Sequence, residues 1–382
     1  MQITTSEPRV RRDSRDATTR RAERRRAAHR RRTIALVAAT LLVTVVMAAL
    51  FVKTGSEPTS TSTRTQSTNP PRPTTTSAPT GVALGTGGVT PFSATSFWNT
   101  PLAADAAVAP DSQQLVGSFN QQWRDNYGGV SINTDDYSIP IYRVPADQAT
   151  VAVSIAPGCN SDAGLLGQLA AVPIPANAQS ANGTDHALVI WQPATDTEWE
   201  LWVAQRAFDG SWSACWGGRI ENVSQSQGVF PYPYGVSASG MSYLAGAIKA
   251  SELQAGRIDH ALAVNVVHAT RGTQVPPANR TDGNSTGPDA IPEGTRFRLD
   301  PSIDVTKLGL PPGGVAIARA LQEYGMYVTD KSGAVVLTAE SSAPYVAAGR
   351  PNPYDQAFGG LPAYQVLAGI PWDRLQVIQP PS

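Results

Sequence analysis

The chain has 382 residues, of which 41% are hydrophobic and 16% charged, with 33 Gly and 31 Pro. This hydrophobic content can bury a sizeable core and excludes wholesale disorder, while the frequency of Gly and Pro excludes a coiled coil. Basic and acidic side chains balance at 30 each, but residues 1–32 carry twelve arginines against four acidic residues. The net charge of zero therefore says nothing about partners, because the opposite charges lie in separate segments.

Residues 33–52 form an apolar run without a charged side chain. Twenty helical residues span about 30 Å, the thickness of a bilayer's hydrocarbon core. The arginines before the run predict a single-pass anchor in the cell membrane, with the N-terminus cytoplasmic and the main domain extracellular. A cleaved signal peptide is the alternative, although its apolar region is usually about 7 to 15 residues long. Because topology explains the arginines, we expect no nucleic-acid partner.

Two further segments follow the predicted membrane helix. Residues 53–90 are rich in Ser, Thr, Pro and Gly and have little to bury, which predicts a disordered linker. Residues 91–382 carry aromatic and β-branched runs broken by Gly, Pro, Asn and Asp, which predicts a β-rich domain. Because strands and helices do not alternate, we expect a mainly β fold, an antiparallel β-sandwich or a jelly-roll-like domain with a few short helices.

The β-rich domain is expected to contain nine strands, two hairpins and three helices. The predicted strands cover residues 138–144, 149–155, 186–192, 197–204, 260–268, 295–299, 326–329, 334–339 and 374–378. Turn residues at 193–196 and 331–333 predict the two antiparallel hairpins. The predicted helices cover residues 111–123, 239–250 and 314–324, the last ending at Gly325.

Cys159 and Cys215 are the only cysteines. Both lie on the predicted outer side of the membrane, where oxidation persists, so we expect a disulfide between them. A reactive thiol or a metal ligand is the alternative, but no C-x-x-C spacing occurs and neither cysteine has a histidine beside it.

Five of the eight tryptophans lie between Trp191 and Trp216. If the strands on either side of the 193–196 turn pair, and their side chains alternate between the two faces of the hairpin, one face carries Val189, Trp191, Glu198, Glu200 and Trp202. We expect this face to be open and the opposite face to be core. Indoles cover the apolar faces of sugars, and paired carboxylates carry out glycoside hydrolysis.

Under this hypothesis, Glu198 and Glu200 share the acid and the nucleophile or base roles. Trp191 and Trp202 position the sugar. The alternative is that both acids are simply the solvated face of an outer strand.

The tetrapeptide Asp-His-Ala-Leu occurs at 185–188 and again at 259–262. His186 and His260 with a carboxylate would suit a cupin-like metal site, or one histidine could be the base of a polysaccharide lyase. In either case Asp185 and Asp259 would orient the imidazoles, and Asp185 is also a candidate for binding the substrate. Alternation places both histidines with apolar residues, so buried structural histidines are the alternative. No cofactor is predicted, and a metal ion enters only in the cupin-like case.

The face that carries Asp259 continues with Ala261, Ala263 and Asn265. We expect these small side chains to leave a groove for a glycan chain, bound by Asn265, with Asp259 assisting catalysis.

The segment 274–293 is long, polar and rich in Pro and Gly. Long loops in compact domains are often functional. Arg280 and Asp282 are its candidates for contacting a substrate.

Seven motifs occur in a fixed order: SFWNTPL, DHALVIW, TEWELW, AGRIDHAL, EGTRFRLDP, LQEYGMYVTDKSG and PWDRLQV. In this set the chain is similar to an uncharacterised family of secreted or membrane-anchored bacterial proteins, mainly actinobacterial. The resemblance covers residues 92–377 and implies one homologous domain outside the cytoplasm. It implies no activity, cofactor or catalytic residue.

The sequence thus predicts an extracytoplasmic carbohydrate-active domain whose partner is a polysaccharide of the cell envelope or the environment. As an enzyme it would be a glycoside hydrolase or a polysaccharide lyase. A lectin-like module using the same indoles, a cupin-like metal enzyme and a purely structural envelope protein are the alternatives. The sequence makes no prediction of the oligomeric state.

Overall fold

The computed structural model describes residues 83–160 and 162–380. In it, the predicted turn at 193–196 joins two neighbouring strands of a five-stranded sheet. The strand order is β1-β3-β5-β6-β9. The strands are β1 (Ala83–Leu84), β3 (Ile141–Arg143), β5 (Leu188–Gln192), β6 (Thr197–Trp202) and β9 (Trp216–Glu221). β5 and β6 are antiparallel with Gln192 opposite Thr197, which confirms the predicted hairpin and its register. β3 and β5 are parallel, so the prediction of a wholly antiparallel fold is wrong.

A second sheet has six strands in the order β16-β13-β14-β10-β15-β2. They are β2 (Ser131–Asn133), β10 (Leu262–Val266), β13 (Arg296–Leu299), β14 (Met326–Lys331), β15 (Val336–Thr338) and β16 (Leu375–Val377). The hairpin predicted at 331–333 is wrong, because β10 lies between β14 and β15. The turn instead crosses the end of β10, where the Ser332 amide donates to the Val266 carbonyl at 2.8 Å.

Two small sheets complete the strands. One joins β4 (Val153–Ile155), β8 (Trp212–Ala214) and β7 (Gln205–Arg206), and the other joins β11 (Ala269–Gln274) and β12 (Ile291–Glu293). All nine predicted strand segments contain a strand. Within the described residues the sheets do not close into a barrel.

The helices are short. They are α2 (Ser112–Asp125), α3 (Ala163–Gln168), α4 (Tyr243–Gly246), α5 (Ala250–Ala255), α6 (Pro312–Glu323) and α7 (Ala343–Ala347), with 3-10 turns η1 (Pro193–Thr195), η2 (Val223–Gln225), η3 (Val305–Lys307) and η4 (Trp372–Arg374). The predicted helices at 111–123 and 314–324 are confirmed as α2 and α6. The chain leaves α6 through Gly325, whose φ of +77° is the left-handed conformation that favours glycine. The predicted helix at 239–250 is instead divided between α4 and α5.

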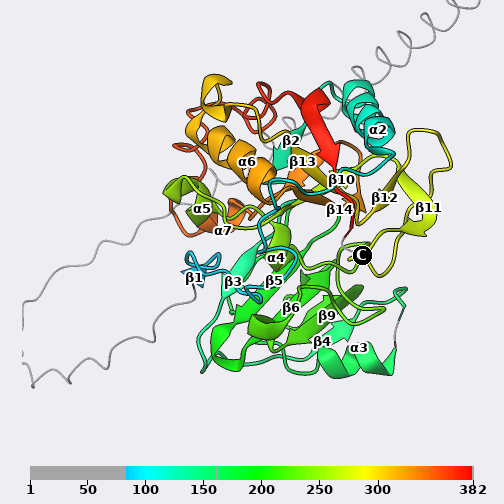
Figure 1. Cartoon of the computed structure of the whole chain (residues 1–382). Coiled ribbons are helices and arrows are strands. Elements are labelled where there is room, and N and C mark those ends of the chain that lie inside the picture. Colours follow the sequence, from blue (N-terminus) through cyan, green and yellow to red (C-terminus); the bar gives the residue numbers. More distant parts are fainter. Residues whose placement is uncertain (1–82, 161, 381–382) are drawn as a thin grey trace, which may run out of the picture. The chain divides into compact units, whose positions relative to one another are not determined.

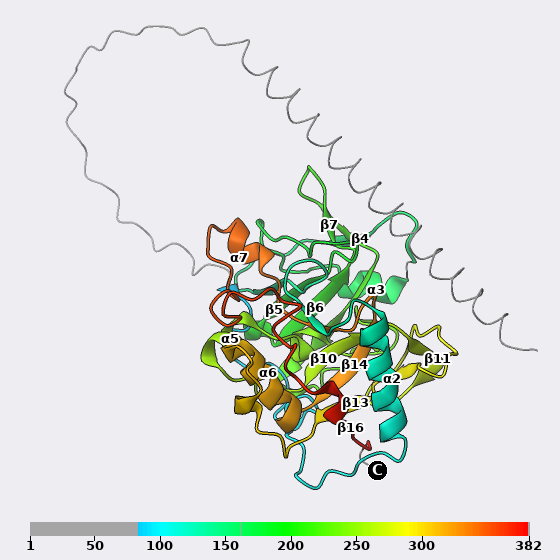
Figure 2. The same ribbon diagram turned by 90° about the horizontal axis from the view of Figure 1, so that it is seen from above.

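Apolar side chains gather in three clusters that follow the two large sheets. The first cluster joins the six-stranded sheet to α2 and α6, which lie together on one side of it in Figure 1 and Figure 2. The second contains side chains from both large sheets, among them Val189, Trp191, Ala263 and Tyr327. The third joins the five-stranded sheet to α3 and the β4-β8-β7 sheet. The central hairpin is therefore covered on both faces.

The disulfide between Cys159 and Cys215 is confirmed, with a Cα–Cα distance of 5.1 Å. Among the helices of the described residues, none is long and apolar enough to cross a bilayer. The predicted membrane segment at 33–52 lies outside these residues. β1, which pairs with β3, falls within the range predicted as linker.

Candidate functional site

The two carboxylates of β6 lie inside the protein. Glu198 and Glu200 are each 0% exposed, because β6 pairs with β5 on one side and β9 on the other while residues 242–244 cover its inner face. The prediction that this face is open is wrong. The alternative of a solvated outer strand is wrong for the same reason.

Both acids hold the start of α4. Glu200 Oε1 accepts hydrogen bonds from the Tyr243 amide at 2.6 Å and from the Leu244 amide at 3.2 Å. The Ser242 hydroxyl lies 3.2 Å from an oxygen of each glutamate. The first amides of a helix have no partner within the helix, so a buried carboxylate here stabilises the turn. This environment fits a structural role for the pair rather than contact with a substrate.

Burial changes the protonation of this pair. Desolvation raises the pKa of Glu200 from 4.5 to about 7, although the α4 amides oppose the shift. Desolvation and the neighbouring Glu200 charge raise the pKa of Glu198 well above its ordinary value. Two carboxylates this close share a buried site most easily when one of them is protonated.

The two candidate tryptophans separate in the structure. Trp191 is only 4% exposed and packs in the core between the sheets, with the Arg143 guanidinium 5.7 Å from its ring centroid. Its predicted contact with a sugar is therefore wrong. Trp202, at the end of β6, is 40% exposed and lines a cavity.

The histidines have structural environments. His186 Nδ1 lies 3.1 Å from the Ala181 carbonyl oxygen. His260 is buried, with Nε2 3.0 Å from both Lys249 Nζ and Glu252 Oε1. Within residues 83–160 and 162–380, neither histidine belongs to a group of three side chains positioned to share a metal ion, which removes the geometric support for a cupin-like site.

The predicted alanine groove is also absent from the described part of the chain. Ala261 and Ala263 are 0% exposed and pack in the core between the two large sheets. Asp259 lies at the surface in an ion pair with Arg257 and does not reach the cavity described below.

A cavity of about 1430 Å³ opens where loops of both large sheets meet. Its aromatic lining consists of Tyr127, Tyr137, Trp202, Trp216, Tyr243 and Tyr364. Tyr127 and Tyr364 are largely exposed, Tyr137 and Trp202 are a little under half exposed, and Tyr243 is buried. Trp216 is half-buried and stacks on Tyr234 with the ring centroids 6.0 Å apart. The disulfide also lines the wall. The cavity therefore offers flat apolar surfaces to a ligand.

Polar side chains line the same cavity. They include four predicted substrate-binding residues, Asp185, Asn265, Arg280 and Asp282. The register of β10 on β14 shifts between Val264 and Asn265, which places Asn265 beside Asp330 at the cavity. With Trp202, five of the six predicted substrate-binding residues meet here, whereas none of the five predicted catalytic residues does.

Arg280 is tied to the protein main chain. Its guanidinium donates to the carbonyls of Gly235 at 2.8 Å and Ser237 at 2.6 Å, and also to that of Pro233. These bonds fix the 233–237 segment at the edge of the cavity. Its positive charge faces the cavity, but most of its donors are already used.

Two lining residues have strained backbones. Tyr127 has a φ of +68° and Tyr137 a φ of +57°, in the left-handed region that residues other than glycine rarely adopt. Gly183, opposite Tyr137, leaves the space for that ring, since a Cβ there would lie 2.9 Å from Tyr137 Cε1. Such strain tends to gather at functional sites, where the surrounding structure maintains it.

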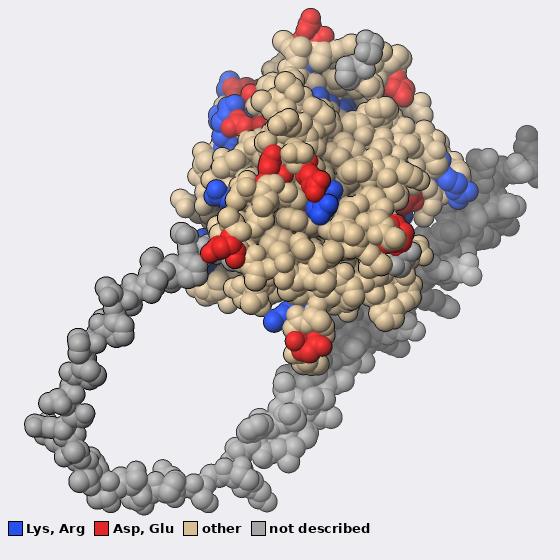
Figure 3. Space-filling model, turned by 90° about the horizontal axis from the view of Figure 1, so that it is seen from below, with Lys and Arg blue, Asp and Glu red and all other residues tan. Residues whose placement is uncertain are grey.

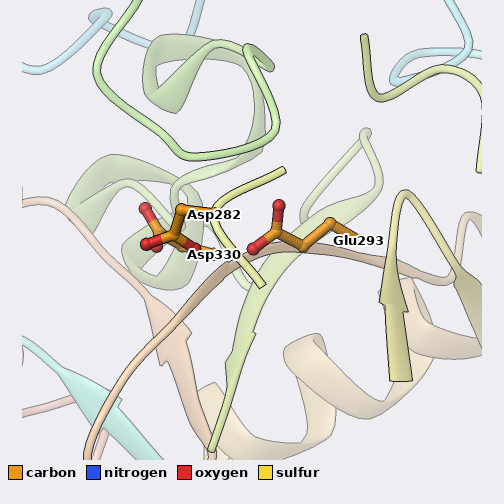
Figure 4. Close-up of side chains that lie close together, drawn as sticks. All are labelled: Asp282, Glu293 and Asp330. Carbon is orange, nitrogen blue, oxygen red and sulfur yellow. The ribbon is translucent and has the colours of Figure 1, made fainter. Parts of the chain in front are cut away.

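Three carboxylates meet at the wall of the cavity (Figure 4). Asp282 comes from the segment between β11 and β12, Glu293 from the end of β12 and Asp330 from β14. One oxygen from each lies within 4.8 Å of the other two. Asp282 and Asp330 line the cavity, and Glu293 lies behind them with 0% exposure. Carboxylates at this distance can share protons or hold a cation.

The partners of the three acids differ. Asp330 accepts from the Ala238 amide at 3.0 Å and from the Tyr243 hydroxyl at 3.1 Å, and Asp282 pairs with Lys331. Burial and the neighbouring Asp330 raise the pKa of Glu293 to about 9. Burial and the neighbouring Asp282 raise the pKa of Asp330 to about 6.

The sequence carried a partial signal for the residues that the site predictions missed. Glu293 opens the EGTRFRLDP motif, and Asp330 interrupts the strand of LQEYGMYVTDKSG. An acid that follows an apolar strand marks the point where the strand leaves the core. Because Asp330 lies 37 residues beyond Glu293 in the sequence, only the fold shows that it meets Asp282 and Glu293.

No known protein-family model, curated protein or solved structure matches this chain.

Proposed function

We propose that the domain binds a carbohydrate chain in the cavity lined by Trp202, Tyr137, Tyr127 and Tyr364. The observation that carries this proposal is the combination of exposed aromatic rings with carboxylate and amide groups in one cavity. Aromatic rings contact the apolar faces of sugar rings, while carboxylate and amide groups bind the hydroxyls at their edges. Asp185 and Asn265 provide such polar groups.

The size of the cavity favours a chain over a single sugar. Sites for one small molecule usually occupy about 300 to 1,000 Å³. The cavity of about 1430 Å³ exceeds this range, and its exposed rings are spread over several loops. An oligosaccharide could therefore contact several rings at once.

The cavity lining carries both signs of charge, with Arg280 and Lys331 against Asp185, Asp282 and Asp330, which is compatible with a neutral ligand. On the face in Figure 3, the described Lys, Arg, Asp and Glu side chains are scattered singly or in small groups over a largely uncharged surface. Polyanion-binding proteins instead gather Lys and Arg on one face.

The proposed setting is outside the cell, on a single-pass membrane anchor at residues 33–52. The Cys159–Cys215 disulfide supports this setting, because disulfides persist in oxidising compartments. The ligand would then be a polysaccharide of the cell envelope or of the environment.

A binding experiment tests the proposal. The full-length protein is titrated with oligosaccharides from arabinogalactan, peptidoglycan and plant glycans, in parallel with a Trp202→Ala variant. We expect at least one oligosaccharide to bind and the variant to bind it about tenfold more weakly, because an aromatic anchor typically contributes 1 to 2 kcal/mol. Measuring released reducing ends in the same samples separates binding from hydrolysis.

Phe208→Ala is the matched control, since Phe208 is fully exposed but does not line the cavity. It should leave the affinity unchanged. Equal loss in both variants, or no binding by the wild type to any glycan in the panel, would contradict the proposal.

A further inference from the structure

The carboxylate cluster of Asp282, Glu293 and Asp330 has a geometry that the proposed sugar contacts do not require. We infer that these three side chains form a calcium site on the wall of the cavity. The inference stands apart from the proposed function, because it concerns the cation alone.

The arrangement of ligands suits one shared cation. Ca²⁺ binds carboxylate oxygens at about 2.3 to 2.6 Å, so two oxygens on one ion lie at most about 5 Å apart. The three nearest oxygens of the cluster lie within 4.8 Å of one another. They come from three separate segments, and irregular all-oxygen sites of this kind suit Ca²⁺ better than Mg²⁺, which usually keeps several waters.

Glu293 supplies an independent observation. It is 0% exposed, and neither of its carboxylate oxygens has a hydrogen-bond partner among the described residues. Figure 4 shows its carboxyl group directed toward Asp330, with Asp282 beside Asp330. A buried carboxyl group without a hydrogen-bond partner is costly in either protonation state, and a cation shared by the three acids would remove that cost.

The neighbouring cations do not fill this role. The Arg280 guanidinium donates to three main-chain carbonyls. Lys331 Nζ contacts the side chain of Asp282 and lies 3.1 Å from its carbonyl oxygen. Lys331 therefore satisfies the exposed acid but makes no hydrogen bond to Glu293, and it would compete with a bound cation for Asp282.

The remaining bonds of Asp330 leave room for a metal ion. Its Oδ2 accepts from the Ala238 amide and the Tyr243 hydroxyl, and its Oδ1 accepts from the Lys331 amide at 2.8 Å. Each bond orients the carboxylate, as second-layer contacts do for metal ligands. The hydrogen bond from the Tyr243 hydroxyl to Asp330 also brings a tyrosine next to the proposed site, so that tyrosine excitation can sensitise a bound lanthanide.

The test uses the full-length protein after removal of metals with EDTA. Calcium chloride is titrated while the thermal unfolding temperature is measured, and Tb³⁺ emission is recorded on tyrosine excitation. We expect a saturable rise of several degrees, and Tb³⁺ emission that Ca²⁺ suppresses by competition. Glu293→Gln should weaken the apparent calcium affinity at least tenfold, whereas Asp185→Asn, which alters a carboxylate of the same cavity outside the cluster, should leave it unchanged.

Two further variants keep the test decisive. Asp282→Asn alters an exposed acid and should also weaken calcium binding tenfold, even if Glu293→Gln does not fold. Lys331→Gln removes the competing ammonium and should strengthen binding at least threefold, an effect that a merely structural acid cluster would not show. No saturable response of the wild type, equal affinities in wild type and Asp282→Asn, or stabilisation by Mg²⁺ alone would overturn the inference.

Discussion

At the residue scale, the environment of a carboxylate decides what it can do. Glu198 and Glu200 lie two residues apart on one face of β6, but both are fully buried and Glu200 binds the amides of α4. Asp282 and Asp330 lie on the cavity instead. The sequence pattern could predict that Glu198 and Glu200 share a face of β6. It could not predict that residues 242–244 would cover that face.

The Glu200 carboxyl also makes stability depend on pH. Its pKa is raised by burial from 4.5 to about 7, so between these values the folded protein keeps a proton that the unfolded chain has lost. The contribution is thus present below pH 4.5 and is lost as pH rises through about 7.

Glu200→Gln should reduce this dependence. An amide keeps an oxygen acceptor for the α4 amides but does not titrate. Between pH 4.5 and 7, unfolding of the variant should therefore release about one proton fewer than unfolding of the wild type. The slope of its unfolding free energy against pH should be shallower by up to about 1.4 kcal/mol per pH unit. Urea denaturation across this range measures it, and parallel profiles for wild type and variant would contradict the assignment.

At the element scale, the positions of β10 and α4 build the core between the large sheets. Ala261 and Ala263 are small because α4 and the Trp98 ring pack against β10 there, and not because a groove runs over them. A Cβ on Gly246 would lie 2.6 Å from the Trp98 ring and 2.9 Å from Ala263 Cβ. The helix can approach the strand only because position 246 is glycine.

Gly246→Ala should therefore destabilise the protein by about 1 to 3 kcal/mol through overpacking. Gly117→Ala in α2 is the control, because a Cβ there meets no atom within 4 Å. That substitution should be neutral or stabilising by up to about 1 kcal/mol, since alanine favours the helix. Chemical denaturation compares the two, and an equal effect would contradict the packing of α4 on β10.

The local patterns predicted many elements but not their partners. All nine predicted strand segments contain a strand and two of the three predicted helices are confirmed, whereas seven strands and the helices α3 and α7 were not predicted. β9 was missed because its Gly217 and Gly218 break the alternation, although Gly218 is required by the close approach of the Gly235 amide. The order of β14, β10 and β15 depends on contacts distant in sequence, which turn residues alone do not encode.

At the scale of the whole molecule, we propose that the domain is displayed outside the membrane. The disulfide closes a separation of 56 residues and lies on the wall of the cavity. In the chain-entropy model such a link contributes about 3 to 5 kcal/mol. An oxidising compartment would thus both stabilise the domain and fix the cavity wall.

Intact cells provide a test of this placement. We expect Cys159 and Cys215 to react with a maleimide only after reduction, and externally added protease to degrade the domain. Thiols that react without a reductant, or protection of the domain until the cells are lysed, would contradict an extracellular location.

The central claim is that the cavity around Trp202 binds a carbohydrate chain. A crystal structure of the protein with its tightest-binding oligosaccharide tests it most directly. We predict sugar rings stacked on Trp202, with hydroxyls in reach of Asp185 and Asn265. An oligosaccharide bound elsewhere on the protein, with the cavity occupied only by water, would contradict the claim.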